Sequence, residues 1–550
     1  MADVADSPKP VLSPDASTLP WWQGAVIYQI YPRSFRDTNG DGIGDLKGVI
    51  EGLDHIASLG VDGIWISPFF TSPMADYGYD VADFCGVDPI FGTLEDFDAV
   101  VARAHALGLK VIIDQVYSHT SDHHDWFIES RSSRDNPRAD WYVWADPKSD
   151  GSPPNNWQSV FGGPSWEWDA RRSQYYFHNF LKEQPDLNVH NEEVQNALIA
   201  AGRFWLDRGV DGFRLDALNF AMHDQSLRDN PPSGVSAHEA TRPFDMQLKT
   251  HSMSQPETVG FIEKFRAMLN EFPGTFTVAE VGGPNPIKEM KSFTEGKERL
   301  NSAYNFDFLY APELTASRVI ESANLWDQSE QEGWPSWAFS NHDAPRAVTR
   351  WAPGAHRDEM ARLYMMLLMS LRGNPIIYQG EELGLPQAHV PYSHLKDPEA
   401  ITNWPKTLGR DGARTPIPWE SEKPNAGFST GEPWLPVDPE HMRLSVDAQQ
   451  GNDSMLRFTK DALATRRRHA ALMSGQMHFA ETGREDLLAI ARTSDDDRIV
   501  ALFNFGADGA DIPAAIPIDG SVILASKPLK EDALGDRHLP ARTGVWLSLR

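Results

Sequence analysis

Short apolar runs that alternate with amphipathic stretches are the feature that most constrains the fold of this chain. Seven clear runs and one weak run (303–308) cover residues 25–31, 61–66, 109–114, 211–216, 275–280, 303–308, 336–341 and 374–379. The stretches 48–59 and 95–107 between them have the spacing of a helix with one apolar face. Apolar strands that alternate with helices are typical of a parallel sheet covered on both faces. Eight of them predict an α/β protein built on a (β/α)8 TIM barrel.

Two connections in this expected barrel are too long for simple turns, and the pattern changes near the C-terminus. The connection after the third strand is rich in Trp, Asp, Pro and Gly, which indicates an inserted domain B, and the one after the fourth strand is expected to be a lid loop. Short strands without helices between them predict a C-terminal antiparallel β-sandwich domain. The expected boundaries are 1–20 for a disordered leader, 21–117 and 191–472 for the barrel, 118–190 for domain B, 221–260 for the lid and 473–550 for the C-terminal domain.

Charge and composition narrow the possible partners. The formal net charge is −28, which argues against binding to nucleic acid or to an anionic membrane, since both need a basic surface. The sequence contains no run of 18 apolar residues, and its first 20 residues lack the basic and apolar regions of a secretory signal. Cys85 is the single cysteine and cannot form an internal disulfide, which favours a cytoplasmic protein. A neutral small-molecule substrate and a monomer or homodimer are expected.

Carboxyl groups stand where two neighbouring barrel strands should end. Asp216 closes the fourth apolar run and Glu280 the fifth, and a barrel places its active site at the C-terminal ends of its strands. Adjacent strands lie less than about 5 Å apart, so both carboxyls can face one small group. Arg214 points to the same side as Asp216 and should keep it ionised, whereas the apolar stretch before Glu280 should keep that group protonated. One anionic and one acidic carboxyl at close spacing predict glycoside hydrolysis with retention of configuration.

Several sequence blocks resemble the α-amylase family, glycoside hydrolase family 13. "GFRLDALNF" (212–220), "TVAEVGG" (277–283), "FSNHD" (339–343) and "DQVYSHT" (114–120) resemble its general blocks. "QPDLN" (184–188), "GNPIIYQGEELG" (373–384) and "RDGARTP" (410–416) resemble its α-glucosidase and oligo-1,6-glucosidase branch. The resemblance runs from about Trp21 to the C-terminus and is loose over the β-domain. Ser118 stands where the first block commonly has asparagine, which indicates a sub-branch.

The resemblance implies roles for individual residues. Asp216 would be the nucleophile, Glu280 the general acid/base, and Asp343 the group that binds the 2- and 3-hydroxyls and stabilises the transition state. Arg214 would orient Asp216. The residues expected to bind the terminal glucose are Asp76, Tyr79, His119, Phe161, His342 and Arg414, with Arg414 closing the pocket beside Asp76.

The same resemblance implies a retaining, exo-acting α-glucosidase for disaccharides and small neutral α-glucosides, capable of transglucosylation. Ala217 follows the nucleophile, and a small side chain there goes with a preference for α-1,4 bonds in the resembling branch. A sucrose-processing or isomerising member of the family and an α-1,6-specific oligosaccharide glucosidase are the alternatives. No organic cofactor is implied.

The stretch "DTNGDGIGD" (37–45) begins like an EF-hand calcium loop. An EF-hand needs a bidentate glutamate at its twelfth position, where this chain has Gly48, and the run before the loop reads as a strand rather than a helix. The oxygens that could still surround one hard cation are the side chains of Asp37, Asn39, Asp41 and Asp45 and the carbonyl of Ile43. In the resembling branch this loop holds a structural Ca²⁺ or Mg²⁺ away from catalysis, and a metal-free turn is the alternative.

Overall fold

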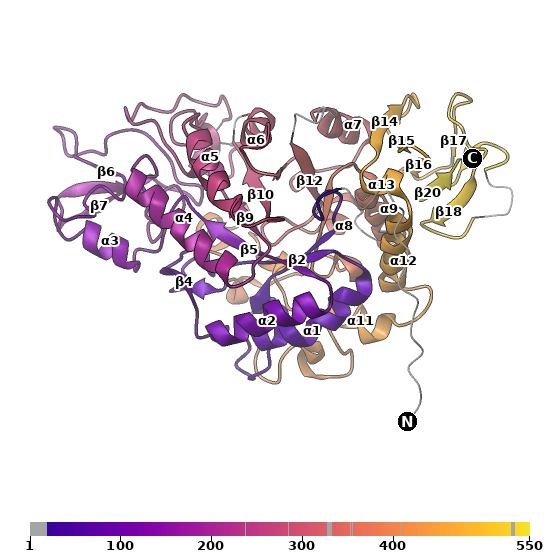
Figure 1. Cartoon of the computed structure of the whole chain (residues 1–550), viewed down its shortest axis with the longest axis horizontal. Coiled ribbons are helices and arrows are strands. Elements are labelled where there is room, and N and C mark those ends of the chain that lie inside the picture. Colours follow the sequence, from indigo (N-terminus) through magenta and orange to yellow (C-terminus); the bar gives the residue numbers. More distant parts are fainter. Residues whose placement is uncertain are drawn as a thin grey trace.

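The computed structural model describes residues 19–549, except 237, 284, 327–332, 353, 355, 408 and 530–533. Of the predicted leader, residues 1–20, residues 1–18 lie outside the described part of the chain. The molecule is elongated, with a central barrel, the strands of the 118–190 insertion at one end and the C-terminal sheet at the other (Figure 1).

In the part of the chain that the structure describes, eight parallel strands close into a barrel in which each strand pairs with its neighbours in chain order. The strands are β1 (Ile27–Ile30), β2 (Gly63–Ile66), β5 (Lys110–Val116), β9 (Gly212–Asp216), β10 (Phe276–Val281), β11 (Ser302–Asn305), β12 (Trp334–Ala338) and β13 (Asn374–Tyr378). Each lies within or overlaps one of the apolar runs, including the weak one, which confirms the predicted fold class. Their continuous apolar character follows from burial on both faces.

Helices surround this barrel. They include α1 (Leu46–Leu59), α2 (Leu94–Ala106), α4 (Glu192–Asp207), α5 (Thr258–Leu269), α6 (Pro286–Thr294), α7 (Ala316–Asn324), α8 (Ala347–Trp351), α9 (Arg357–Ser370), α12 (Met455–Arg468) and α13 (Ala470–Met473). The buried side chains of α2 are Phe97, Val100, Val101 and Ala104. They form one face of the helix, as the apolar spacing of the 95–107 stretch predicts. Its first turn is closed by a capping box between Thr93 and Asp96.

Two tryptophans close the N-terminal end of the barrel. The indole N–H of Trp21 donates to the carbonyl of Gly274 over 2.6 Å, and the ring of Trp22 stacks on Phe276, the first residue of β10, at 5.8 Å. With this end covered, the C-terminal ends of the strands remain for a binding site.

The insertion carries its own small sheet. Strands β6 (Trp144–Ala145), β8 (Gln174–Phe177) and β7 (Trp166–Asp169) pair in that order beside helix α3 (Asp125–Ser130). A short hairpin, β3 (Phe70–Thr71) with β4 (Asp83–Val87), precedes it and holds residues 72–82 between its strands. In the lid segment, residues 221–260, the 3-10 turn η4 (Pro243–Met246) precedes the start of α5.

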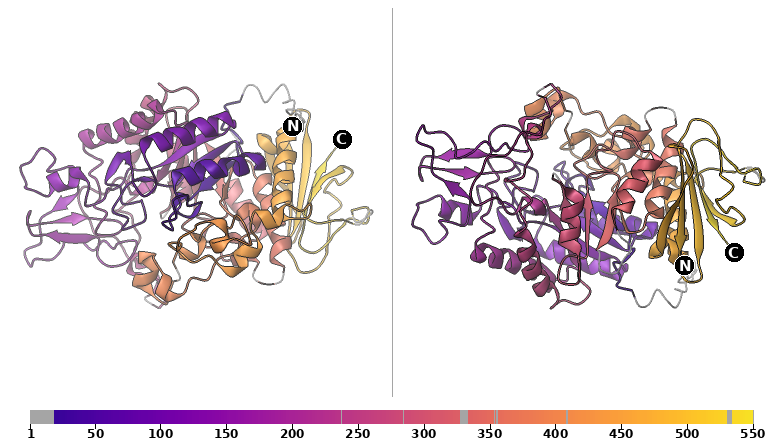
Figure 2. Two further views of the ribbon diagram at one scale, coloured as in Figure 1. Left: turned by 90° about the horizontal axis from the view of Figure 1, so that it is seen from below. Right: turned by 90° about the horizontal axis from the view of Figure 1, so that it is seen from above.

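The C-terminal region is antiparallel, as the sequence predicts. Among the described residues of this region, a five-stranded sheet has the order β14 (Gln476–Ala480), β15 (Leu487–Thr493), β16 (Arg498–Asn504), β20 (Thr543–Ser548) and β18 (Ser521–Ala525). A two-stranded ribbon, β17 (Ala510–Asp511) with β19 (His538–Leu539), shares an apolar cluster with one face of that sheet. The other face packs on the barrel, where the indole of Trp546 donates to Ser370 of α9 over 2.7 Å. Both views in Figure 2 show this sheet standing against the barrel helices. Within the described ranges, no helix has the length and apolar character needed to cross a membrane.

Candidate active site

The ends of three neighbouring strands meet at one guanidinium. Arg214 on β9 is fully buried, and its Nη1 lies 2.8 Å from Oδ1 of Asp114 on β5 and also pairs with Asp216 at the end of β9. Its Nη2 lies 2.6 Å from Oε1 of Glu280 on β10. Strand alternation places Arg214 and Asp216 on the same side, as expected. One cation thus serves three carboxyl groups.

Burial dominates the ionisation of this group. It raises the pKa of Asp216 to about 7 and that of Glu280 to about 7, although Arg214 acts to lower both. Asp216 itself raises the pKa of Glu280, because two charges so close repel each other. Arg214 therefore lowers the pKa of Asp216 in the expected direction but does not outweigh burial, whereas the expected raised pKa of Glu280 is found. The carboxyls of Asp114, Asp216 and Glu280 around this one guanidinium therefore retain a proton near neutral pH.

The residue after Asp216 adopts a conformation that the sequence does not announce. Ala217 has φ 41° and ψ 39°, in the left-handed region that few residues other than glycine adopt. Its backbone N–H donates to Oε2 of Glu280 over 3.3 Å. The turn at the end of β9 thus helps to position the carboxyl group at the end of β10.

Asp343 is held as an anion by a different set of groups. Its Oδ1 accepts from Nη2 of Arg414 at 2.7 Å and from Nη1 of Arg410 at 3.4 Å, and its Oδ2 lies 3.2 Å from Nε2 of His342. Burial acts to raise the pKa of Asp343, but the positive charges of Arg414 and Arg410 outweigh it and hold the pKa below its ordinary value. The backbone N–H of Asp343 donates to the side chain of Asn341, which shapes the loop after β12.

The arginine beside Asp76 is not the predicted one. Nη2 of Arg410 lies 2.7 Å from Oδ1 of Asp76, whereas Arg414 is fully buried and donates to the carbonyl of His342 over 2.8 Å. This corrects the expected position of Arg414. Both belong to the block "RDGARTP", but the 3-10 turn η7 (Asp411–Ala413) separates them, and spacing alone could not show which one faces Asp76. The guanidinium of Arg410 also lies over the ring of Phe161 at 5.0 Å.

Tyr79 joins the two histidines. Its ring stacks on His342 at 5.3 Å with an angle of 7°, and its carbonyl lies 3.0 Å from Nε2 of His119. Burial lowers the pKa of His119 to about 4 and that of His342 to about 3, so both rings are neutral. Oγ of Ser118 lies 2.9 Å from Nδ1 of His119. Ser118, which stands where asparagine is common, therefore forms a hydrogen bond with the imidazole of His119.

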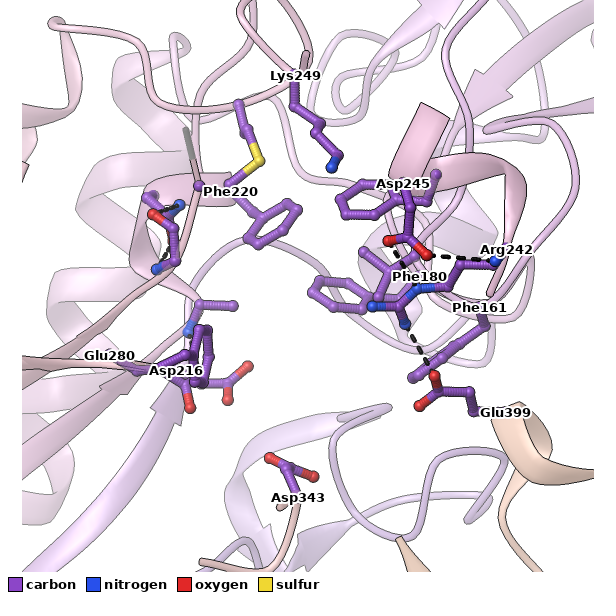
Figure 3. A pocket seen from close by; sticks show the side chains of 18 of the residues that line it. Phe161, Phe180, Asp216, Phe220, Arg242, Asp245, Lys249, Glu280, Asp343 and Glu399 are labelled. Atoms are coloured by element: carbon purple, nitrogen blue, oxygen red, sulfur yellow. Dashed lines mark hydrogen bonds and ion pairs between the residues drawn. The ribbon is translucent and has the colours of Figure 1, made fainter. Parts of the chain in front are cut away.

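These side chains surround a pocket of about 450 Å³ (Figure 3). Of the ten predicted catalytic and substrate-binding residues, those that line it are Asp76, Tyr79, His119, Phe161, Asp216, Glu280 and Asp343. Arg214, His342 and Arg414 lie behind them. The outer wall was missed by sequence reasoning: its residues include Arg242, Phe244, Asp245 and Lys249 from the lid segment, together with Tyr310 and Glu399. The length of the lid segment indicated that it would lie beside the binding site, but it did not indicate which of its side chains face the pocket.

Comparison with known proteins agrees with this geometry. The family model "Alpha amylase, catalytic domain" matches residues 29–475. The chain belongs to the α-amylase family. This family member is 52% identical over 508 residues to "Probable alpha-glucosidase" of Rhizobium meliloti (strain 1021), with 91% of each chain covered. It is 36% identical to "Oligo-1,6-glucosidase" of Heyndrickxia coagulans, with 88% of this chain and 92% of that one covered. The crystal structure of the α-glucosyl transfer enzyme XgtA superposes with a TM-score of 0.91 at 47% identity and covers 97% of this chain and 100% of that one.

The loop 37–45 of this α-amylase family member is ordered by its own side chains. Oδ1 of Asp37 accepts from the N–H groups of Asn39 and Gly40, and Oδ1 of Asp41 accepts from that of Ile43, all at 2.8 to 2.9 Å. Asp45 caps α1 by accepting from Gly48 over 2.7 Å. Across the described residues, no group of three or more His, Cys, Asp or Glu side chains is arranged to hold a metal. A cation here would therefore depend on amide and carbonyl oxygens beside Asp37 and Asp41, and such an all-oxygen set suits a hard cation.

Proposed function

We propose that this chain is a retaining, exo-acting α-glucosidase that hydrolyses terminal α-linked glucose from disaccharides and small α-glucosides. The observation that carries the proposal is the arrangement of Asp216 and Glu280, which face one guanidinium at the bottom of a pocket. The relative named "Probable alpha-glucosidase", at 52% identity, supports the same activity.

The geometry supports a double-displacement mechanism. Asp216 attacks the anomeric carbon as the glycosidic oxygen leaves with a proton from Glu280, which gives a covalent glucosyl-enzyme. Glu280, now deprotonated, takes a proton from water as the water attacks that carbon, and Asp216 is released. The anionic Asp343 stabilises the positive charge that develops on the sugar ring. An alcohol that replaces water would give transglucosylation.

The ion pair of Asp76 and Arg410 supports exo action. Both residues line the pocket, and both are at least nine-tenths buried. Their paired charges offer hydrogen bonds to the hydroxyls of one terminal glucose. A longer chain on that side of the glucose would have to displace the pair.

The backbone at Ala217 supports a preference for α-1,4 bonds. A small side chain leaves room beside the reacting bond, and the left-handed conformation disfavours a β-branched valine at this position. The alternatives are α-1,6 specificity, which the named oligo-1,6-glucosidase relative supports, and the processing or isomerisation of sucrose.

A substrate panel tests the proposal. Maltose, isomaltose, sucrose and trehalose are compared at equal concentrations, and the first-formed anomer of glucose is followed by NMR. We expect fastest hydrolysis of maltose, with α-glucose formed first. First-formed β-glucose would overturn the retaining mechanism, faster hydrolysis of isomaltose would overturn the linkage preference, and isomerisation of sucrose would overturn the hydrolase assignment.

We also propose that the loop 37–45 binds a structural Ca²⁺ or Mg²⁺ through Asp37, Asn39, Asp41 and the carbonyl of Ile43. The support is an oxygen-only donor set on a loop that precedes α1. Asp45, which was also expected to bind the cation, is left out of this set because it caps α1 by accepting from the N–H of Gly48. The single cysteine supports a cytoplasmic location, and a monomer or homodimer remains the predicted state.

A further inference from the structure

Arg242 joins two segments that are distant in the sequence at the mouth of the pocket. Its Nη1 lies 3.0 Å from Oε1 of Glu399, at the start of helix α10 (Pro398–Asn403). Arg242 belongs to the lid segment, and both side chains line the pocket. Their exposed fractions are 23% and 17%, so the ion pair is shielded from most of the solvent. Such a pair restrains its two segments more than an exposed pair does.

The same arginine is held within the lid segment. Its backbone N–H donates to Oδ2 of Asp245 over 3.2 Å, and its guanidinium lies over the ring of Phe244 at 5.6 Å. Lys249 also lies over that ring, at 4.0 Å. Phe244 is part of the pocket lining, so the pair with Glu399 restrains an apolar wall of the pocket as well as the charged groups.

Other contacts tie the lid segment mainly to the insertion. The indole of Trp157 donates to the carbonyl of Arg228 over 2.8 Å, and the amide of Gln247 donates to the carbonyl of Asn156 over 2.7 Å. On the side of α10, the pair of Arg242 with Glu399 is accompanied by the longer contact of Lys406 with the carbonyl of Ala240, at 3.3 Å. Loss of the ion pair would therefore free the lid segment on that side while its other anchors remain.

The ion pair of Arg242 and Glu399 lies on the side of the pocket where the leaving group of the substrate would bind. Asp216 and Glu280 lie on the opposite side of the pocket from Arg242 and Glu399 (Figure 3). Asp76 and Arg410 close the end that would hold the glucose, so the rest of the substrate must extend past the lid segment.

We propose that the ion pair of Arg242 and Glu399 is a latch that determines the length of the accepted substrate. It holds the lid segment against α10. The space for a second sugar unit in the leaving group is thereby narrowed. This inference rests on the proposed α-glucosidase function.

The test uses E399Q, which removes the charge at nearly unchanged side-chain volume, and R242Q, which removes the charge and shortens the side chain, together with the double variant. The control is R228Q, because Arg228 forms an ion pair with Asp224 in the same lid segment but does not line the pocket. The readout is the ratio of kcat/KM for maltotriose to kcat/KM for maltose. We expect each single variant to raise this ratio about fivefold, R228Q to leave it unchanged, and the double variant to raise it no further than either single one.

An unchanged ratio in E399Q, or additive effects in the double variant, would overturn the latch. Hydrogen exchange of residues 238–249 provides a readout without turnover: E399Q should exchange faster there than the wild type at an unchanged Tm, and equal exchange would also overturn it. If the wild type hydrolyses no α-glucoside, the proposed function fails, and hydrogen exchange still decides whether the ion pair restrains the lid.

Discussion

Arg214 sets the charge at the bottom of the pocket, because one buried guanidinium faces the carboxyls of Asp114, Asp216 and Glu280. Three carboxylates around one cation cannot all ionise readily in a buried site, so a proton is retained in the group near neutral pH. A retaining mechanism needs this state, with one carboxylate as nucleophile and one carboxyl as acid.

The substitution D216N tests the nucleophile. Asparagine keeps the shape of the side chain but cannot form the glycosyl ester, so kcat should fall by roughly 1,000-fold or more. The circular dichroism spectrum should remain that of the wild type. Near-normal turnover in a folded D216N variant would contradict the assignment.

The substitution E280Q tests the acid. A natural disaccharide needs protonation of its leaving group, whereas nitrophenolate leaves without it. The loss of kcat/KM should therefore be at least about tenfold larger for maltose than for nitrophenyl α-glucoside. The decline of wild-type activity above about pH 7, where Glu280 loses its proton, should be absent from the E280Q profile on the nitrophenyl substrate. Equal losses on both substrates would contradict the role.

The raised pKa of Glu280 also predicts how stability depends on pH. Its folded-state pKa of about 7 lies above the ordinary value of 4.5, so its contribution is fully present below pH 4.5 and is lost as the pH rises through 7. Relative to E280Q, the wild type should lose about 3 kcal/mol of unfolding free energy across this interval. Urea unfolding of both proteins at about pH 5 and about pH 8 measures it. A parallel pH dependence would contradict the shift.

The residues at the bottom of the pocket were predicted from the sequence more completely than those of its wall. Asp216 and Glu280 could be placed because they end apolar runs, and the ends of neighbouring parallel strands must meet. Arg410 could not be distinguished from Arg414, because a 3-10 turn decides which of them faces Asp76. The raised pKa of Asp216 could not be foreseen, because the sequence shows a nearby arginine but not the burial of the carboxyl group.

At the scale of elements, the loop before α1 combines two functions. Asp45 caps the helix, while Asp37, Asn39 and Asp41 fold the preceding turn around their own oxygens. The helix and the barrel strand before it were evident in the apolar pattern. The cap was less evident, because an aspartate in an acidic loop can serve either a helix or a metal.

Two variants separate these functions. D45A should lower the unfolding free energy by about 1 kcal/mol both with and without a chelator, because it removes a helix cap. D41A should lower Tm in the presence of Ca²⁺ and make it insensitive to EDTA. In the wild type, EDTA should lower Tm more than it lowers the initial rate. Immediate loss of activity on EDTA addition, with the fold intact, would contradict a structural role for the metal.

At the scale of the whole molecule, the C-terminal sheet supports the barrel from outside. Trp546 is fully buried between the sheet and α9, where it meets Ser370. The antiparallel strands were predicted from their pattern, but this contact joins residues 176 positions apart and depends on how the two domains pack.

The substitution W546A should lower the unfolding free energy by about 3 kcal/mol or more, because it leaves a large cavity between the domains. Thermal loss of activity should shift with it, although the pocket is distant. The control is W168A, since Trp168 on β7 is 43% exposed. Equal effects of the two substitutions would show that the interface does not stabilise the barrel.

The ion pair of Asp76 and Arg410 closes the pocket at one end. This determines the order in which products leave and water enters. The leaving group occupies the side nearer to solvent and must depart first, before water can reach the glucosyl-enzyme. Glucose departs last, by the route through which the next substrate arrives. Free glucose should therefore compete directly with substrate, and a good acceptor that occupies the vacated space should be glucosylated at the expense of hydrolysis.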